Sequence, residues 1–257
     1  MEESTCMRPR RAIVRPPSRA FPSCISSHPL RDTIDVDKAV RQHEAYCNAL
    51  KELGIELLVM NQEEEYPDSC FVEDTAVVHN GKALIAKMAR PSRQGEENTV
   101  EALLKQYMRV RRVTKPGTLE GGDVIHLPNK LMTGVSQRTN IDGVFQMRDW
   151  LEVEVSAIRD PNIVHLKSHV TFLSKKNMIC RNAYRDHPAL EKYNLVILED
   201  EDNYAANTLT IGETVLMPAG FGRAATLVRE AGYEVMPIEV SEFEKCEGAL
   251  TCLSILF

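Results

Sequence analysis

Residues 74–88, which read DTAVVHNGKALIAKM, contain two short runs of β-branched and other apolar residues on either side of Asn80-Gly81. Both turn residues tolerate the positive φ that a two-residue hairpin turn requires. The stretch therefore predicts a β-hairpin. Three further stretches have the same form around a polar turn: 123–135, 170–181 and 208–218.

A helical pattern follows each hairpin, with apolar residues three and four positions apart. The predicted helices are 96–107, 141–151, 189–193 and 221–231. One more strand follows each helix, at 110–114, 153–158, 195–199 and 235–240. The order strand–strand–helix–strand therefore occurs four times, which indicates an internal repeat.

A fifth copy of this ββαβ unit is divided between the two ends of the chain. Its first strand would be 250–256, its second 12–15, its helix 36–53 and its last strand 55–60. Five units closed by pairing of the chain ends form a ring, which protects strand edges. We therefore predict an α/β fold, a five-bladed propeller in a single domain over residues 1–257. A doubly wound sheet is the alternative, but no strand-borne G-x-G-x-x-G loop supports it.

The composition excludes several classes of protein. Hydrophobic residues make up 43% of the chain and charged residues 26%, which is typical of a globular protein. A net charge of −6 argues against a nucleic-acid partner, whose backbone demands clustered positive charge. No apolar run approaches the roughly 20 residues that cross a bilayer, and the start lacks the apolar core of a secretory signal. We expect a cytoplasmic protein without a membrane segment.

The seven cysteines are spread along the chain without a short C-x-x-C spacing. A disulfide framework or a zinc cluster would need paired spacings. We therefore expect no metal site, and most of the thiols to be small buried side chains in a reducing compartment. The open question is which of them is reactive.

The loops that lead from the last strand of one unit to the hairpin of the next should return to the same central end of the ring. These loops are 66–74, 116–123, 160–168, 200–207 and 243–252, and they are rich in carboxylates. They also contain His165 and Cys252. Taken singly, each of these two residues is more often a core side chain. Together, in loops carried on a rigid scaffold, they suit a cationic substrate that is attacked by sulfur.

Seven motifs occur in order along nearly the whole chain. They are VRPPSRA (14–20), PDSCFVED (67–74), GTLEGGD (117–123), RTN (138–140), HLKS (165–168), YAAN (204–207) and TCLS (251–254). With these motifs the chain resembles the dimethylarginine dimethylaminohydrolases, members of the guanidine-modifying superfamily with the pentein fold. The resemblance implies a five-bladed α/β propeller of pseudo-symmetric units, the first of which is closed by the C-terminal strand.

The resemblance also implies the roles of individual residues. The catalytic set would be Cys252 as the nucleophile, His165 as the general acid and base, and Glu120 as the carboxylate that orients the histidine. The substrate-binding set would be Glu73 and Asp74 for the guanidinium, Asp68 for the α-amino group, Arg93 and Arg138 for the α-carboxylate, the backbone of Ile25 and Cys246, and Ser168 as a supporting residue. Neither a metal ion nor an organic cofactor is implied.

These residue types suit the chemistry of a guanidinium, whose central carbon is a poor electrophile because its charge is delocalised. Carboxylates bind the charge and fix the plane of the group. A thiolate is the competent nucleophile, and we expect its pKa to fall from about 8.5 beside a protonated imidazole or a cationic substrate. The implied reaction converts asymmetric dimethylarginine or monomethylarginine to L-citrulline and dimethylamine or methylamine, through a covalent thiouronium on the cysteine.

Two alternatives stay open. An arginine deiminase or another guanidine hydrolase would use the same Cys–His–carboxylate set, whereas a non-catalytic pentein would share the ring and bind a macromolecule. The expected partner is a small guanidine, and a homodimer is left open. Residues 19–32 depart from the relatives and are expected to form a lid over the substrate. Residues 1–10 match none of the motifs and are expected to be disordered.

Overall fold

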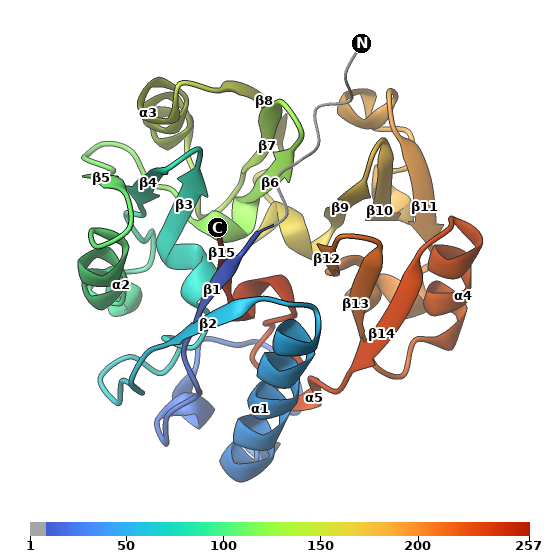
Figure 1. The fold of residues 1–257 in the computed structure, drawn as a ribbon, viewed down its shortest axis with the longest axis horizontal. Coiled ribbons are helices and arrows are strands. Elements are labelled where there is room, and N and C mark those ends of the chain that lie inside the picture. Colours follow the sequence, from blue (N-terminus) through green and yellow to red (C-terminus); the bar gives the residue numbers. More distant parts are fainter. Residues whose placement is uncertain (1–8) are drawn as a thin grey trace.

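The computed structural model describes residues 9–257 of the chain (Figure 1). Disorder is predicted for residues 1–10, of which residues 1–8 lie outside the described residues. Arg10 is described, and its N–H donates a 2.9 Å hydrogen bond to the carbonyl of Phe257. The two ends of the described chain therefore lie side by side.

The described residues form five three-stranded sheets arranged around a common centre (Figure 1). In sheet order they are β15 (Ile255–Leu256), β1 (Arg11–Val14) and β2 (Glu56–Val59); β3 (Ala76–His79), β4 (Lys82–Ile85) and β5 (Arg109–Arg112); β6 (Val124–Leu127), β7 (Lys130–Val135) and β8 (Glu154–Arg159); β9 (Val170–Ser174), β10 (Asn177–Arg181) and β11 (Asn194–Leu198); and β12 (Leu209–Ile211), β13 (Thr214–Pro218) and β14 (Glu234–Ile238). In every sheet the first pair is antiparallel and the second pair is parallel. The predicted repeat and fold class are confirmed.

A parallel pair needs a crossover connection, and helices supply it in four of the five units. These helices lie on the outside of the ring in Figure 1 and are α1 (Val36–Glu52), α2 (Glu97–Leu104), α3 (Ile141–Leu151) and α4 (Gly222–Glu230), while the short α5 (Ser241–Glu244) precedes the last central loop. The predicted helix 189–193 is wrong, because this crossover contains only short 3-10 turns, one of them Pro188–Leu190. None of the helices over residues 9–257 is long and apolar enough to cross a bilayer.

The ends of the chain close the ring in the first sheet. β1 pairs in parallel with β2 and antiparallel with β15, so that Ile13 lies opposite Ile255. The predicted strand 250–256 is too long, because Thr251–Leu253 form a 3-10 turn. The apolar character of this stretch, which indicates a strand, reflects burial at the centre of the ring instead, since all three residues of the turn are buried.

Each of the five sheets is preceded by a short 3-10 turn, and we call these five segments the central turns. They are Val72–Thr75, Gly121–Asp123, Leu166–Ser168, Asp200–Ala206 and Thr251–Leu253. Turn 72–75 contacts both 251–253 and 121–123, and turn 166–168 contacts both 121–123 and 200–206. The scaffold therefore brings five segments that are far apart in sequence to one place.

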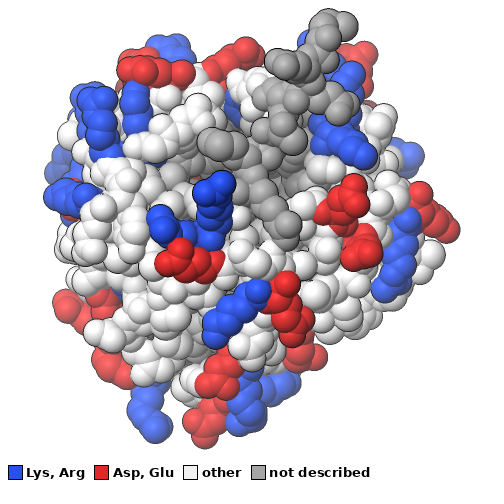
Figure 2. Space-filling model, in the orientation of Figure 1, with Lys and Arg blue, Asp and Glu red and all other residues white. Residues whose placement is uncertain are grey.

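Four of the described cysteines are buried free thiols, as expected for most of them, but two others are paired, which the sequence spacing did not indicate. Cys24 and Cys246 form a disulfide across 222 positions of sequence. Ring closure brings the first and the last loops of the chain together, so no short spacing in the sequence records the pair. Acidic and basic side chains are interspersed around the face shown in Figure 2.

Candidate active site

The predicted catalytic side chains and Asp74 lie within the central turns or immediately before them. Glu120 and His165 both immediately precede a turn and have nearly the same extended backbone, with φ/ψ of −129°/139° and −135°/142°. Asp74 lies within turn 72–75 and Cys252 within turn 251–253. Because neighbouring turns contact one another, side chains from four units of the repeat meet at the centre.

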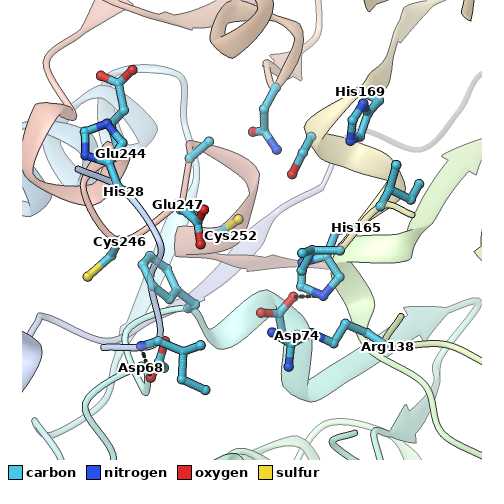
Figure 3. Close-up of a pocket in the computed structure, with 18 of the residues that line it drawn as sticks. His28, Asp68, Asp74, Arg138, His165, His169, Glu244, Cys246, Glu247 and Cys252 are labelled. Atoms are coloured by element: carbon cyan, nitrogen blue, oxygen red, sulfur yellow. Dashed lines mark hydrogen bonds and ion pairs between the residues drawn. The ribbon is translucent and has the colours of Figure 1, made fainter. Parts of the chain in front are cut away.

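A cavity of about 390 Å³ opens over these turns (Figure 3). The predicted site residues that line it are Ile25, Asp68, Asp74, Arg93, Arg138, His165, Ser168, Cys246 and Cys252. In Figure 3, Asp74, Arg138 and His165 lie on one side of the cavity, Asp68 and Cys246 on the other, and Cys252 between them. Glu73 and Glu120 are not among the lining residues.

His165 is held by a carboxylate that is sealed from solvent. Its Nε2 lies 2.8 Å from Oε2 of Glu120, whose other oxygen accepts a 3.0 Å hydrogen bond from the N–H of Ala89. Asp74 Oδ1 is 3.7 Å from the same nitrogen. Burial alone would lower the pKa of His165, but Asp74 and Glu120 outweigh it and raise the pKa to about 9. The imidazole is therefore protonated near neutral pH and can donate a proton.

The thiol of Cys252 behaves differently from the prediction. Burial, with a further contribution from the charges of Glu73 and Asp74, raises its pKa to about 12. Without a bound substrate, the pKa of Cys252 is therefore not lowered as expected, and the resting group is a neutral thiol. A cation bound beside the thiol would offset part of this negative charge and favour the thiolate.

Asp74 belongs to a buried network of alternating charges. The Nη1 of Arg93 donates to Asp74 at 2.8 Å, while its Nε and Nη2 bond to Glu96, which is a partner that no sequence motif indicated. Burial opposes ionisation of Asp74, but His165 and Arg93 prevail and lower its pKa. Asp74 thus presents a negative charge to the cavity, and the guanidinium of Arg93 is already bound by two carboxylates.

Arg138 is the contrasting arginine. It is buried and lines the cavity, yet its Nε and Nη1 have no hydrogen-bond partner among the described residues. A buried guanidinium without partners is costly unless a ligand supplies them. Of the two arginines predicted for the α-carboxylate, Arg138 is therefore the one with free donors.

Glu73 is not among the described residues that line the cavity, and its carboxylate is bound by other side chains. One of its carboxylate oxygens accepts from Nζ of Lys167, and the other accepts a 2.8 Å hydrogen bond from the hydroxyl of Thr251. Asn207 Nδ2 in turn donates to the carbonyl of Lys167 and to the Thr251 hydroxyl. The predicted contact of Glu73 with a guanidinium stays a prediction; in the described structure its carboxylate is bound by Lys167 and Thr251. The Lys167 contact went unpredicted although HLKS contains the residue.

Two glycines allow this close assembly. A Cβ on Gly121 would lie 2.0 Å from the carbonyl oxygen of Glu73. A Cβ on Gly122 would lie 2.7 Å from the Asp74 carboxylate and 2.8 Å from the ring of His165. No side chain fits at either position, so the Gly-Gly pair in this motif is explained by close approach of turns 72–75 and 121–123.

On the opposite side, Asp68 is bound by the first loop. The backbone N–H of Ile25 donates to both of its carboxylate oxygens, at 3.2 and 3.3 Å. Burial raises the pKa of Asp68, partly offset by the charge of Arg93. Asp68 is 5% exposed and lines the cavity, where its carboxylate can accept a further donor.

Asp74, Glu120 and His165 have donor atoms within 4.8 Å of one another, a spacing that could hold a metal ion. The donor set does not fit one. The cationic Arg93 bonds to Asp74 at 2.8 Å, and the raised pKa of His165 leaves its nitrogens occupied by protons. The cluster is better suited to proton transfer than to coordination.

A protein-family model described as "N,N dimethylarginine dimethylhydrolase, eukaryotic" matches residues 26–204. The chain is 32% identical over 250 residues to the N(G),N(G)-dimethylarginine dimethylaminohydrolase of Pseudomonas aeruginosa, covering 95% of this chain and 98% of the relative. It is 35% identical to the protein of the same name from Streptomyces coelicolor, covering 97% of each.

Solved structures of related proteins superpose closely on this chain. The P. aeruginosa protein, as a Cys-to-Ser mutant complexed with citrulline, superposes with a TM-score of 0.94 at 30% identity, over 98% of this chain and 100% of that one. The N-terminal domain of ArgZ, an arginine dihydrolase from cyanobacteria, superposes with a TM-score of 0.87 at 21% identity, over 96% of this chain and 97% of that one. The second comparison shows the fold alone.

Proposed function

The chain belongs to the dimethylarginine dimethylaminohydrolase family, and we propose that it hydrolyses asymmetric dimethylarginine and monomethylarginine to L-citrulline and dimethylamine or methylamine. One observation supports this most: Cys252, an imidazolium at His165 and an ionised Asp74 line the same cavity. That set offers a nucleophile, a proton donor and a counter-charge for a guanidinium.

Each end of a methylated arginine finds a complementary group. Asp74 receives the guanidinium, Asp68 the α-amino group, and the free donors of Arg138 the α-carboxylate. Charge-assisted hydrogen bonds of this kind contribute roughly 1.5–3 kcal/mol each. Arg93 keeps Asp74 ionised and oriented, and Ser168, Ile25 and Cys246 complete the walls.

The bound cation would then activate the nucleophile. Its positive charge beside Cys252 lowers the raised pKa of the thiol, whose proton leaves to solvent. The thiolate forms a bond to the central carbon of the guanidinium, which gives a tetrahedral adduct. His165 donates its proton to the departing amine, the C–N bond breaks, and a thiouronium remains on the cysteine.

The second half of the reaction uses the same imidazole. His165, now neutral, takes a proton from water, and the resulting hydroxide adds to the thiouronium carbon. When the C–S bond breaks, its electron pair stays on the sulfur of Cys252, and the hydroxyl proton of the adduct passes to that thiolate, which leaves the neutral ureido group of citrulline and the resting thiol. Glu120 stays hydrogen-bonded to the ring and stabilises its charged form in both steps.

An assay of citrulline release from dimethylarginine, monomethylarginine and arginine tests the proposal. We expect the methylated substrates to be preferred in kcat/KM. A clear preference for arginine would mean that the same Cys–His–carboxylate set hydrolyses arginine, and would favour the arginine deiminase alternative. Absence of turnover with all three, in protein with a confirmed fold, would favour the non-catalytic alternative.

We also propose a cytoplasmic location. The Cys24–Cys246 disulfide argues in the other direction, because cytosolic thiols are generally kept reduced. Cell fractionation decides the location, and light scattering of the purified protein decides between a monomer and a homodimer.

A further inference from the structure

Residues 19–32, the predicted lid, are attached to the loop that leads to the nucleophile. The disulfide between Cys24 and Cys246 joins the two segments covalently, with a Cα–Cα distance of 6.0 Å. Cys246 lines the cavity, and the next residue after Cys24, Ile25, lines it as well. The covalent link is thus part of the cavity wall.

Hydrogen bonds between the same two segments accompany the disulfide. The hydroxyl of Ser26 donates to the carbonyl of Lys245 at 2.7 Å. Ser27 donates to the carboxylate of Glu247 through both its hydroxyl and its N–H, at 2.7 and 3.3 Å. These contacts of Ser27 are exposed, so water competes with them and each contributes little by itself. The disulfide and the buried packing of Phe21 against Phe243, with ring centroids 5.4 Å apart, are the links that water cannot replace.

The position of Ile25 connects this link to substrate recognition. Its N–H is the donor that holds both oxygens of Asp68, the carboxylate proposed for the α-amino group. Cys24 is buried directly before it, at 1% exposure. A shift of the backbone at Cys24 would therefore release Asp68 as well.

We infer that the Cys24–Cys246 disulfide positions the amino-group side of the pocket, so that affinity for a methylated arginine depends on the oxidation state of this pair. The inference rests on the proposed function. With the disulfide formed, residues 19–32 are already ordered in the folded protein, so substrate binding does not carry the entropy cost of ordering them. When it is reduced, substrate binding must order the segment.

Reduction leaves the catalytic side chains in place. Cys252, His165 and Glu120 are held by the central turns and not by residues 19–32. A dithiol such as dithiothreitol breaks one S–S bond, two S–H bonds form in the protein, and the reagent is oxidised to its cyclic disulfide. The effect should therefore fall on KM and leave kcat unchanged.

Steady-state kinetics on four samples test the inference: oxidised protein, protein reduced with dithiothreitol, Cys24→Ala, and the control Cys180→Ala. Cys180 is a buried free thiol in β10, so its removal changes a core side chain but no link. Thiol alkylation with mass spectrometry verifies the state of the pair. Each sample is assayed with monomethylarginine and with 5-(N′-methylguanidino)pentanoic acid, which lacks the α-amino group.

We expect the KM for monomethylarginine to rise about fivefold to tenfold on reduction and in Cys24→Ala, an effect of the size expected for ordering a few side chains. The KM for the amino-free analogue should change less than about twofold, as should both values in Cys180→Ala. An unchanged KM in reduced protein, or an equal rise for both substrates, would overturn the inference.

A measurement without substrate separates this inference from the proposed function. Amide hydrogen exchange over residues 19–32 should be faster in reduced than in oxidised protein, with the central turns unchanged. Equal exchange in both states refutes the positioning role whatever the enzyme does. Faster exchange in a protein that turns over no methylated arginine would refute the proposed function and retain the role of the disulfide in ordering the segment.

Discussion

On one side of the pocket, His165, Glu120 and Asp74 come from three units and are held by buried charge pairs. On the other side, residues 19–32 and 243–248 are held together by one disulfide, by hydrogen bonds that are mostly exposed or partly buried, and by the packing of Phe21 against Phe243. In the proposed reaction, the first side would set the electrostatics of the reacting groups, and the second would set the approach of the substrate. The two sides should therefore respond to mutation in different kinetic constants.

The largest effect should come from the nucleophile between the two sides. Cys252→Ser replaces the thiol by a hydroxyl that is far harder to ionise, and citrulline release should fall by more than about 10³-fold. Circular dichroism and thermal unfolding should match the unmodified chain, because the side chains are almost equal in size. Cys180→Ala is the matched control and should retain turnover. Undiminished turnover in Cys252→Ser would remove the assignment.

The next largest effect concerns the histidine side. Glu120→Gln keeps the shape of the hydrogen bond to His165 but removes one of the charges that raise its pKa to about 9. We expect kcat to fall by about 10²-fold or more. His165 must be protonated to release the amine, so activity is present below its pKa and declines as the pH rises through about 9. In Glu120→Gln this decline should begin at lower pH.

The pH–rate profile of kcat is the deciding measurement. A fall in kcat without any movement of the alkaline limb would mean that Glu120 only orients the ring. Glu101→Gln supplies a control, because this carboxylate pairs with Lys105 and Arg112 near the surface and has no contact with the site.

The placement of the predicted catalytic residues and of Asp74 could largely be predicted from sequence. The repeat, the central loops and the motifs place Cys252, His165, Glu120 and Asp74 correctly around one centre, because recurring turns impose recurring positions. Their electrostatics could not be predicted in the same way. The pKa of Cys252 is raised, not lowered, because burial and nearby carboxylates act before any substrate is present.

The contacts that were missed depend on the rotation of single residues or on ring closure. Glu73 and Asp74 are neighbours in the same motif, yet one bonds to Lys167 and the other to Arg93. Glu96 binds Arg93 without belonging to any motif. The disulfide joins residues 222 positions apart, a distance over which no local pattern operates.

A smaller effect is expected where the substrate's carboxylate would bind. Arg138→Gln removes the buried guanidinium that has free donors, so KM for monomethylarginine should rise about tenfold to thirtyfold while kcat changes little. N-methylagmatine, which lacks the carboxylate, should show no such rise. Arg181→Gln is the control, since Arg181 also lines the cavity. If Arg181→Gln raises KM and Arg138→Gln does not, the carboxylate site has been misplaced.

The smallest effect is expected for Ser27→Ala. This substitution tests most directly whether the two sides of the pocket are held in different ways. Ser27 makes exposed hydrogen bonds to Glu247 beside the disulfide, so its loss should change KM less than about twofold while the disulfide is intact. In the Cys24→Ala background the same substitution should raise KM by about threefold more, because the two links are in one network and their effects are not additive. A double-mutant cycle with zero coupling energy would show that the disulfide and the hydrogen bonds order the loop independently. Substitutions among side chains held by buried charge pairs should be coupled whether or not the disulfide is present. A coupling energy that depends on Cys24 is therefore specific to the side of the pocket formed by residues 19–32 and 243–248.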